Sequence, residues 1–430
     1  MIMDGKDFIV ERLGDAKIPS PLTKADFIAD DAAVAYPTDM TEIQSYLDQG
    51  LPLPSFQKAG PREKLFHDPA WSKAAILTAG GLCPGLNDVI KSLTRTLRMQ
   101  YKVPMVYGIR YGYRGLIPDY QYEPIILTEE VVDNIHEWGG SILSSSRGRQ
   151  DEGKIVDTLV RMNINLLFCI GGDGTLRCAH DVVKEIRRRK LSISVVCVPK
   201  TIDNDICFID KSFGFETAIY TSSLFVTAAH NEAEGAYNGV GLIKVMGRDS
   251  GFIAAYTTLA NSHINYCLVP EKPFTLDGAG TASLLPNLEE RLKERHHAVI
   301  IVAEGAGQEL FAEHAAKQDA SGNKLHEDIG LLLKERINAY FKERNIEVNL
   351  KYFDPSYTIR SVDAQGTDAV FCTMLAQNAV HAAMAGYTDM VVGHWNDKFT
   401  HVPIALATRT RKKIDLKSDL WNCVRSTVRM

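Results

Sequence analysis

Residues 166–175 read LLFCIGGDGT, and this stretch decides how the chain around it folds. The five apolar residues LLFCI have the length and composition of a β-strand that is covered on both faces. Three glycines at 171, 172 and 174 then allow a tight turn, and a helical pattern begins near Thr175. A buried strand, a glycine turn and a helix together form one unit of an open parallel sheet.

The same alternation of short apolar runs with longer helical patterns continues on both sides of this stretch, from residue 74 onward. Several of the runs are almost entirely apolar, which is typical of parallel strands with helices on both faces. The fold class is therefore α/β. The expected strands are 74–78, 166–170, 193–198, 240–245, 266–269, 298–303, 348–352 and 390–393.

The length and composition of the chain predict more than one domain. With 430 residues and 45% hydrophobic content, the chain can bury two cores. We expect two doubly wound, mostly parallel sheet domains with the active site in the cleft between them, plus an N-terminal extension that wraps the core. Helices near the C-terminus can return to the first domain. The predicted boundaries are 1–70 for the extension, 71–207 and 208–395 for the two domains, and 396–430 for a C-terminal tail.

Charge and cysteine content limit the classes of binding partner and the cellular location that we expect. A net charge of −5 without a basic stripe disfavours nucleic acid and acidic lipid as partners, and leaves small molecules. The basic run KEIRRRK at 184–190 is interpreted as the solvated end of a helix. Eight scattered cysteines without a C-x-x-C pair are typical of reduced thiols and predict a cytoplasmic location. No apolar stretch approaches the roughly 20 residues that span a bilayer, so no membrane role is expected.

Three strand-to-turn junctions carry groups suited to phosphate chemistry, and such junctions converge at the carboxyl edge of an open α/β sheet. The first is TAGGLCPGLN at 78–87, where Gly80, Gly81 and Gly85 let backbone amides point at a phosphate. This motif alone could also be a simple tight connection.

The second junction is GGDGT at 171–175. Its glycines remove side chains where an anion approaches, and Asp173 supplies a hard oxygen ligand for a magnesium–phosphate complex. The alternative is that Asp173 caps the helix that follows.

The third junction is PKTIDND at 199–205. Asp203 and Asp205 lie close in sequence to Lys200 and Thr201, which places a candidate general base beside a cation. An ordinary Asx-type turn is the alternative.

Together with KVMGRDSGF at 244–252, these motifs in this order resemble the phosphofructokinase family over residues ~74–395. The long N-terminal extension and the segment GVGLIKVMGRDSGFIAA are most similar to the trypanosomal and plant-type ATP-dependent branch. GGDGT alone also resembles NAD kinases and lipid kinases, and the other motifs oppose that reading.

The resemblance implies a 6-phosphofructokinase, which transfers the γ-phosphoryl group of ATP to the 1-hydroxyl of fructose 6-phosphate with Mg²⁺ in glycolysis. The first domain would bind ATP and magnesium, and the second would bind fructose 6-phosphate. The resemblance also implies an allosteric enzyme that works as a homo-oligomer, either a dimer or a tetramer.

The resemblance assigns roles to individual residues. Asp203 is the expected base, with Lys200, Thr201 and Asp205 around it in the catalytic turn, and Asp173 is the expected magnesium ligand. Lys351 corresponds to a cation that reaches the sugar phosphate in the neighbouring subunit. The expected donor-binding residues are Gly80, Gly81, Arg110, Arg147, Gly148, Gly172, Asp173, Gly174 and Thr175. The expected substrate-binding residues are Thr201, Asp203, Met246, Gly247, Arg248, Glu304, Lys351, Tyr357 and Arg360.

Two positions bear on the identity of the phosphoryl donor, and they favour different donors. Gly174 leaves room for the α-phosphate and nucleoside of ATP, where pyrophosphate-using relatives carry a second aspartate. Lys200 is the residue that the pyrophosphate enzymes use. Because steric and charge exclusion is the stronger discriminator, we expect ATP. The alternative is a pyrophosphate-dependent fructose 6-phosphate 1-phosphotransferase. A catalytically silent homologue is disfavoured because Asp173, Asp203 and Arg248 are all present.

Overall fold

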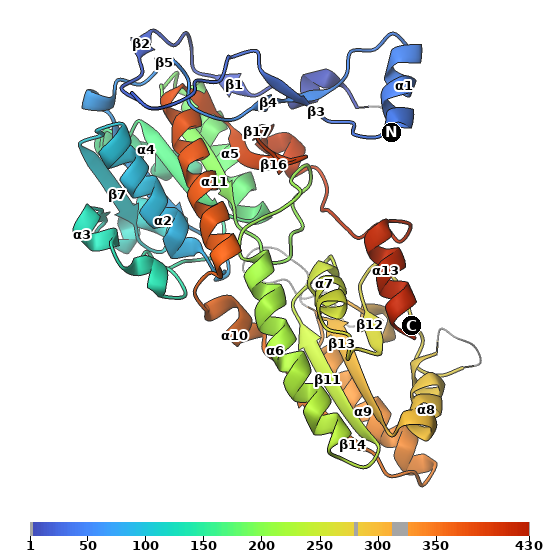
Figure 1. Cartoon of the computed structure of the whole chain (residues 1–430). Coiled ribbons are helices and arrows are strands. Elements are labelled where there is room, and N and C mark those ends of the chain that lie inside the picture. The colour runs from blue at the N-terminus through green and yellow to red at the C-terminus, as the bar shows by residue number, and fades with distance from the viewer. Residues whose placement is uncertain (1–2, 279–282, 312–325, 430) are drawn as a thin grey trace. The chain divides into compact units, whose positions relative to one another are not determined.

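The chain forms two compact units in a computed structural model that describes residues 3–278, 283–311 and 326–429 (Figure 1). The first unit comprises Met1–Thr201, Ile206–Gly214 and Val362–Thr410. The second comprises Ile202–Asp205, Phe215–Ser361 and Arg411–Met430. The chain therefore passes between the units after residues 201 and 205 of the PKTIDND segment, and again after residues 214, 361 and 410.

The sheet of the first unit has nine strands within the described residues, in the order β3-β4-β17-β16-β10-β9-β6-β7-β8. The middle of the sheet, from β16 to β7, is parallel, and the pairings on either side are antiparallel. The strands are β3 (Ala33–Ala35), β4 (Ser55–Lys58), β6 (Lys73–Thr78), β7 (Met105–Ile109), β8 (Ile125–Ile126), β9 (Leu166–Gly171), β10 (Ser194–Pro199), β16 (Met390–Trp395) and β17 (Lys398–Pro403).

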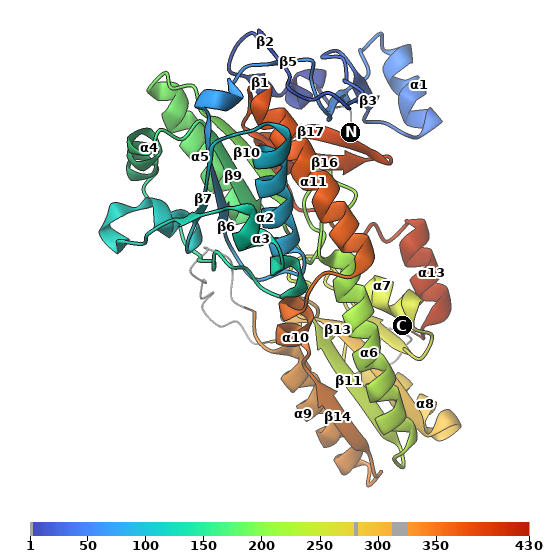
Figure 2. The same cartoon turned by 60° about the vertical axis from the view of Figure 1, so that its left-hand side comes forward.

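Helices cover both faces of this sheet. Helices α2 (Leu86–Arg95) and α11 (Gly366–Met384) lie side by side on one face, as Figure 2 shows. Helices α4 (Glu152–Arg161) and α5 (Asp173–Arg188) cover the other, where alternate strand residues pack against them in one buried core. The basic run that was predicted to end a helix does so, because α5 ends at Arg188.

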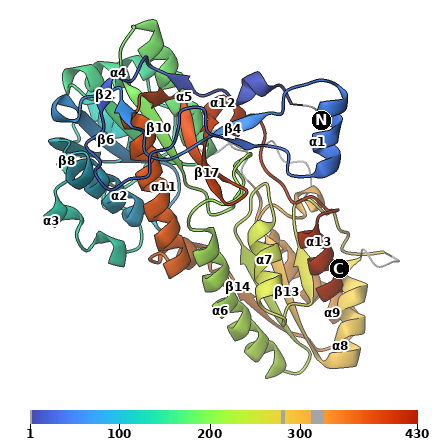
Figure 3. The same cartoon turned by 45° about the horizontal axis from the view of Figure 1, so that its top comes forward.

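The second unit has a four-stranded parallel sheet within the described residues, in the order β12-β13-β11-β14. Figure 3 labels two of these strands, β13 and β14. Helices α6 and α7 pack on one face and α8 and α9 on the other. The strands are β11 (Gly239–Val245), β12 (Tyr266–Leu268), β13 (His297–Ala303) and β14 (Asn349–Phe353). The helices are α6 (Phe215–Glu234), α7 (Phe252–Ala260), α8 (Leu284–Arg295), α9 (Ile329–Glu343), α10 (Ser356–Ser361) and α13 (Asp419–Thr427).

Shorter elements complete the first unit. Two small antiparallel pairs involve the N-terminal residues: β1 with β15 joins them to the rest of the unit, and β2 with β5 lies within residues 1–70. These elements are β1 (Glu11–Arg12), β2 (Ile18–Pro19), β5 (Lys64–Leu65), β15 (Tyr387–Thr388), α1 (Met40–Asp48), α3 (Glu129–Val132) and α12 (Ile404–Ala407).

The α/β class with two mostly parallel sheets is confirmed, and each of the eight expected strands is present within two residues of its predicted ends. The boundaries differ from the predicted ones. Residues 362–410 belong to the first unit, and 396–410 are no tail, because β17 returns antiparallel to β16. The two strands join through Asn396 and Asp397, whose φ angles of 46° and 59° suit a two-residue hairpin.

None of the described helices combines the length and the apolar character needed to cross a membrane. The cytoplasmic location stays a prediction.

The N-terminal residues form part of the first unit's core. Phe56 on β4 is completely buried, and the ring centroids of Phe8, Tyr36, Phe208 and Trp395 lie between 4.9 and 6.3 Å from its own. Such aromatic clusters contribute both buried apolar area and ring–ring contacts. The extension is therefore held by its own side chains in the same core as the sheet.

We predict that Phe56→Ala destabilises the first unit by about 3–5 kcal/mol, because it removes a buried ring and leaves a cavity. Phe27→Ala is the matched control, since Phe27 is 40% exposed and its loss should cost much less. Denaturant unfolding followed by tryptophan fluorescence measures both variants. If both substitutions lower the free energy of unfolding by the same small amount, the extension is not an integral part of the fold.

Candidate active site

Three loops of the first unit begin at one edge of its sheet. Strands β6, β9 and β10 are adjacent and parallel, with Thr78 opposite Ile170 and Gly171 opposite Pro199. The backbone N–H groups of Ala79 and Lys200 continue this pairing, each at 3.0 Å from a carbonyl oxygen of β9. The three predicted phosphate-handling motifs therefore start side by side.

Two cationic side chains lie against the first glycine loop. A Cβ on Gly80 would lie 3.1 Å from Nζ of Lys200, and one on Gly81 would lie 3.4 Å from Nη2 of Arg147. Gly80 also has a φ of 91°, which an L side chain adopts only with strain. Ser145 Oγ donates to the carbonyl of Gly80 at 2.7 Å, so the loop that carries Arg147 and Gly148 is bound directly to the glycine loop.

The amino end of α5 carries few side chains, because glycines stand on both sides of Asp173. Gly172 precedes the helix, Asp173 is its first residue, and a Cβ on Gly174 would meet no atom within 4 Å. Gly171 is crowded instead, since a Cβ there would lie 2.1 Å from Oγ1 of Thr175. Backbone N–H groups at a helix start favour anions. This region therefore combines open space, amide donors and one carboxylate.

Arg110 follows β7, the next strand along the same edge. Its guanidinium carbon lies 5.2 Å from the ring centroid of Tyr111, and the carbonyl of Tyr111 accepts from Ser146 Oγ at 2.6 Å. Tyr113 Oη donates to the carbonyl of Thr175 at 2.9 Å. The loop after β7 is therefore hydrogen-bonded both to the loop that carries Arg147 and to the first turn of α5. Sequence reasoning missed Tyr111 and Tyr113, although both lie in the GIRYGY segment that supplied Arg110.

Asp203 is a carboxyl of the second unit with one buried oxygen. Its Oδ1 is shielded from solvent, and its backbone carbonyl accepts from Ser250 Oγ at 3.2 Å. Burial raises the pKa of Asp203 well above its usual range, and the charges of Asp205 and Glu304 raise this pKa further. The backbone N–H and guanidinium of Arg248 oppose this rise.

Residues 246–248 form a turn directly after β11. Gly247 has a φ of 124°, and a Cβ there would lie 2.5 Å from the carbonyl oxygen of Ser250. The N–H of Glu304, which follows the adjacent β13, donates to the carbonyl of Val245 at 2.9 Å. Burial raises the pKa of Glu304, whereas the nearby charges of Arg248, Lys244 and Arg360 lower this pKa. The predicted residues Met246, Gly247, Arg248 and Glu304 are thus brought together at one sheet edge.

A buried lysine fixes the loop that carries Tyr357 and Arg360. Nζ of Lys244 pairs with Asp328 at 2.7 Å and with Asp354 at 2.9 Å. Asp354 in turn accepts from Ser356 Oγ at 2.6 Å, where α10 begins. The guanidinium carbon of Arg360 then lies 4.5 Å from the ring centroid of Tyr357. Sequence reasoning missed Lys244, although it opens the KVMGRDSGF motif.

Lys351 lies apart from this group. It is exposed on the edge strand β14, opposite Gly241, four residues before the end of β11. At ~3.3 Å per residue it is about 13 Å along the sheet from the end of β11, and the turn at 246–248 is farther still. Within one chain, Lys351 does not lie with the other predicted substrate residues of the second unit.

Sequence reasoning also missed Arg411. Its Nη1 pairs with Asp205 at 3.2 Å and with Asp249 at 2.7 Å, and the N–H of Lys412 donates to the carbonyl of Asp205 at 2.8 Å. The basic sequence RTRKK at 409–413 was the available signal. It was overlooked because these residues were assigned to a tail.

Comparison with known proteins gives the family. The family model described as Phosphofructokinase matches residues 73–383. The chain belongs to the phosphofructokinase family. Relatives include the ATP-dependent 6-phosphofructokinase of Borreliella burgdorferi, 48% identical over 98% of this chain and 96% of the relative. ATP-dependent 6-phosphofructokinase 7 of Arabidopsis thaliana is 47% identical over 85% of this chain and 75% of its own.

Solved structures agree with the fold of this phosphofructokinase. The pyrophosphate-dependent phosphofructokinase from Marinobacter aquaeolei aligns with a TM-score of 0.67 over 83% of this chain and 91% of that one, at 20% identity. Phosphofructokinase from Saccharomyces cerevisiae aligns with a TM-score of 0.62 over 83% of this chain and 47% of that one, also at 20% identity. At this identity the likeness concerns the fold alone.

Proposed function

We propose that this member of the phosphofructokinase family is an ATP-dependent 6-phosphofructokinase. It transfers the γ-phosphoryl group of ATP to the 1-hydroxyl of fructose 6-phosphate. One observation carries the donor half of this proposal, namely the meeting of Lys200, Arg147 and the open start of α5 at one edge of the sheet. The curated relatives at 43–48% identity over nearly the whole chain are named ATP-dependent 6-phosphofructokinases.

The first unit supplies the donor site in this proposal. Amides near Gly81, Gly172 and Gly174 would face the phosphates, and Lys200 and Arg147 would balance their charge. Asp173 fits a magnesium site, because Mg²⁺ is commonly held by one or two protein carboxylates together with phosphate and water. The described residues contain no cluster of three metal-ligating side chains that would suggest another mode of binding. A bound Mg²⁺ would neutralise and orient the donor phosphates.

The second unit supplies the acceptor site in this proposal. Arg248 and Arg360 would bind the sugar phosphate, Glu304 would accept from sugar hydroxyls, and Asp203 would take the proton from the 1-hydroxyl. A raised pKa suits a base, because the carboxylate then holds a proton more strongly once it has received it. Lys200 and Asp203 are three residues apart, so their Cα atoms lie within about 11 Å of each other.

An assay of the purified protein with fructose 6-phosphate and Mg²⁺ tests this function. We expect fructose 1,6-bisphosphate to form with ATP, with a much lower kcat/KM for pyrophosphate. A preference for pyrophosphate would support the pyrophosphate-dependent alternative. Phosphorylation of NAD or lipid, without turnover of fructose 6-phosphate, would overturn the acceptor assignment.

We predict that Asp203→Asn lowers kcat by about 10²–10⁴-fold, because the amide fits the turn but cannot accept a proton. It should also stabilise the protein at neutral pH. Since the folded-state pKa is raised, the carboxyl contributes stability below its unfolded pKa of ~3.9, and this contribution is lost as pH rises through the folded pKa.

Steady-state kinetics and unfolding at pH 4 and pH 7 measure both effects, with Asp277→Asn, an exposed carboxyl of the same unit, as the control. In the unaltered enzyme, kcat should fall as pH drops through the raised pKa of Asp203. Turnover within about threefold of the unaltered enzyme would remove Asp203 from this role.

For donor choice, we predict that Gly174→Asp lowers kcat/KM for ATP by one to three decades. Like charges about 4 Å apart repel by roughly 1 kcal/mol in water and about 4 kcal/mol at an effective dielectric of 20. Because a Cβ at 174 meets nothing, the substitution fits without disturbing the loop. Gly174→Asn has the same size without the charge. The ratio of kcat/KM for ATP to that for pyrophosphate should drop most in Gly174→Asp, and an unchanged ratio would contradict this account of position 174.

We also propose that the enzyme is a homo-oligomer, a dimer or a tetramer, in which Lys351 reaches the substrate of a neighbouring subunit. Its exposed position on β14, distant from the turn at 246–248, supports this role. Two exposed side chains with apolar groups on α6 also support association, since Tyr220 and Leu224 are 52% and 56% exposed. Exposed apolar groups on one helix face are typical of interfaces.

A hybrid experiment tests the oligomer. Lys351→Ala and Asp203→Asn should each be nearly inactive, but co-expressed chains should regain activity, because a mixed interface contains one intact Asp203 and one intact Lys351. Sedimentation of the unaltered protein reports its assembly state. A fully active monomer, or hybrids without recovery, would exclude the proposed sharing of Lys351.

A further inference from the structure

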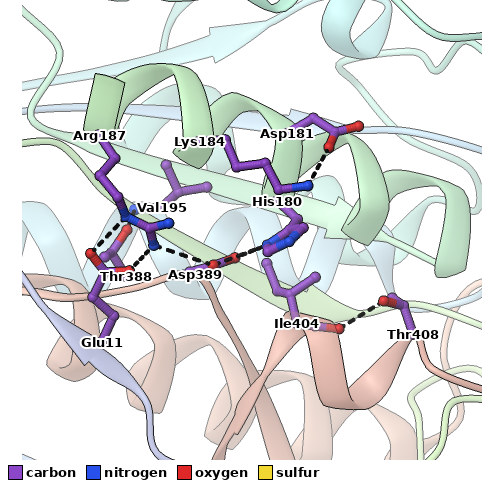
Figure 4. Close-up of polar contacts among 10 residues, drawn as sticks. All are labelled: Glu11, His180, Asp181, Lys184, Arg187, Val195, Thr388, Asp389, Ile404 and Thr408. Atoms are coloured by element: carbon purple, nitrogen blue, oxygen red, sulfur yellow. Dashed lines mark hydrogen bonds and ion pairs between the residues drawn. The ribbon is translucent and has the colours of Figure 1, made fainter. Parts of the chain in front are cut away.

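Helix α5 is bound along its length by the segment 388–408 of the same unit (Figure 4). Nδ1 of His180 lies 2.8 Å from Oδ1 of Asp389, and Arg187 pairs with both Glu11 and Asp389. Asp389 is held in turn by its backbone, whose N–H donates to the carbonyl of Val195 on β10 at 3.1 Å. Helix α5, which begins at the glycine loop, is therefore held by Asp389 and Glu11 through His180 and Arg187.

The same segment contacts the first turn of α5 through Arg177. Nε of Arg177 pairs with Oδ2 of Asp173 at 3.0 Å, and its Nη2 donates to the carbonyl of Thr408. Thr408 is buried, and its N–H and Oγ1 both donate to the carbonyl of Ile404, at 3.0 and 2.8 Å. One guanidinium thus joins the carboxylate at the helix start to a rigid backbone carbonyl.

We propose that Arg177 is a positioning residue that sets the orientation of Asp173 for magnesium binding. By holding Oδ2, the guanidinium fixes the direction in which Oδ1 points. Ligating carboxylates are commonly oriented by such outer hydrogen bonds, whose loss typically weakens metal binding by 10–100-fold. The inference rests on the proposed role of Asp173 as the magnesium ligand.

An ordinary ion pair along the helix is the competing explanation. Residues 173 and 177 are four apart, and such pairs on helices contribute a few tenths of a kcal/mol to stability alone. The contact with Thr408 goes beyond this, because it comes from a segment 231 residues away in sequence. Only a planar fork with several N–H groups can hold both partners in fixed directions, so Lys should be a poor substitute for Arg.

Binding of Mn²⁺ to the full-length enzyme, with the non-hydrolysable ATP analogue AMP-PNP present, tests the proposal without turnover. Electron paramagnetic resonance of free Mn²⁺ gives the dissociation constant. We expect Arg177→Gln to weaken Mn²⁺ binding by 10–100-fold, with Arg177→Lys close to Gln, and the affinity for fructose 6-phosphate alone to stay within twofold. Arg188→Gln is the control, since Arg188 pairs with Glu185 at the other end of the same helix.

The variant Asp173→Asn and the double variant Asp173→Asn/Arg177→Gln distinguish failure of the proposed ligand role of Asp173 from failure of the inference about Arg177. If Asp173→Asn leaves Mn²⁺ binding unchanged, the proposed ligand role of Asp173 fails. If Asp173→Asn weakens binding and Arg177→Gln leaves it unchanged or tightens it, the inference about Arg177 alone fails. The double variant should bind no more weakly than Asp173→Asn, because Arg177 acts through that carboxylate. If the losses of Mn²⁺ affinity in the two single variants add up in the double variant, Arg177 does not act through Asp173.

Discussion

Parallel pairing of β6, β9 and β10 in matched register is the constraint on which the proposed donor site depends. Because Thr78, Ile170 and Val198 lie opposite one another, three loops leave the sheet at the same level. Lys200 and Arg147 can then approach glycines of a neighbouring loop. A register shift of one residue in β10 would turn Lys200, which directly follows this strand, to the other face of the sheet.

Burial of charge shapes the proposed acceptor site in a different way. Oδ1 of Asp203 is shielded from solvent, and burial together with the charges of Asp205 and Glu304 raises the pKa of this carboxyl. Arg411, which pairs with both Asp205 and Asp249, offsets part of this negative charge. In the proposed function, this arrangement gives up stability at neutral pH to keep a strong proton acceptor in place, as active sites often do.

The strands and the glycine loops could be predicted from the sequence, because buried parallel strands and tight turns leave local patterns such as LLFCIGGDGT. The contacts of Arg411, Lys244 and Arg177 could not, since each of these side chains has a partner 84 or more residues away in sequence. The hairpin at Asn396 and Asp397 had a local signal that was overlooked, and the error placed β17 and Arg411 in a tail. The roles of the predicted site residues stay predictions.

A crystal structure of the enzyme with AMP-PNP and Mg²⁺ tests most directly whether the aligned loops form the donor site. The account predicts phosphate density against the backbone of Gly81 and residues 172–174, with Nζ of Lys200 within hydrogen-bonding distance of a phosphate oxygen and Asp173 directed at the metal. Phosphates bound at another edge of the sheet, or a nucleotide that leaves Lys200 and Asp173 without contact, would contradict it.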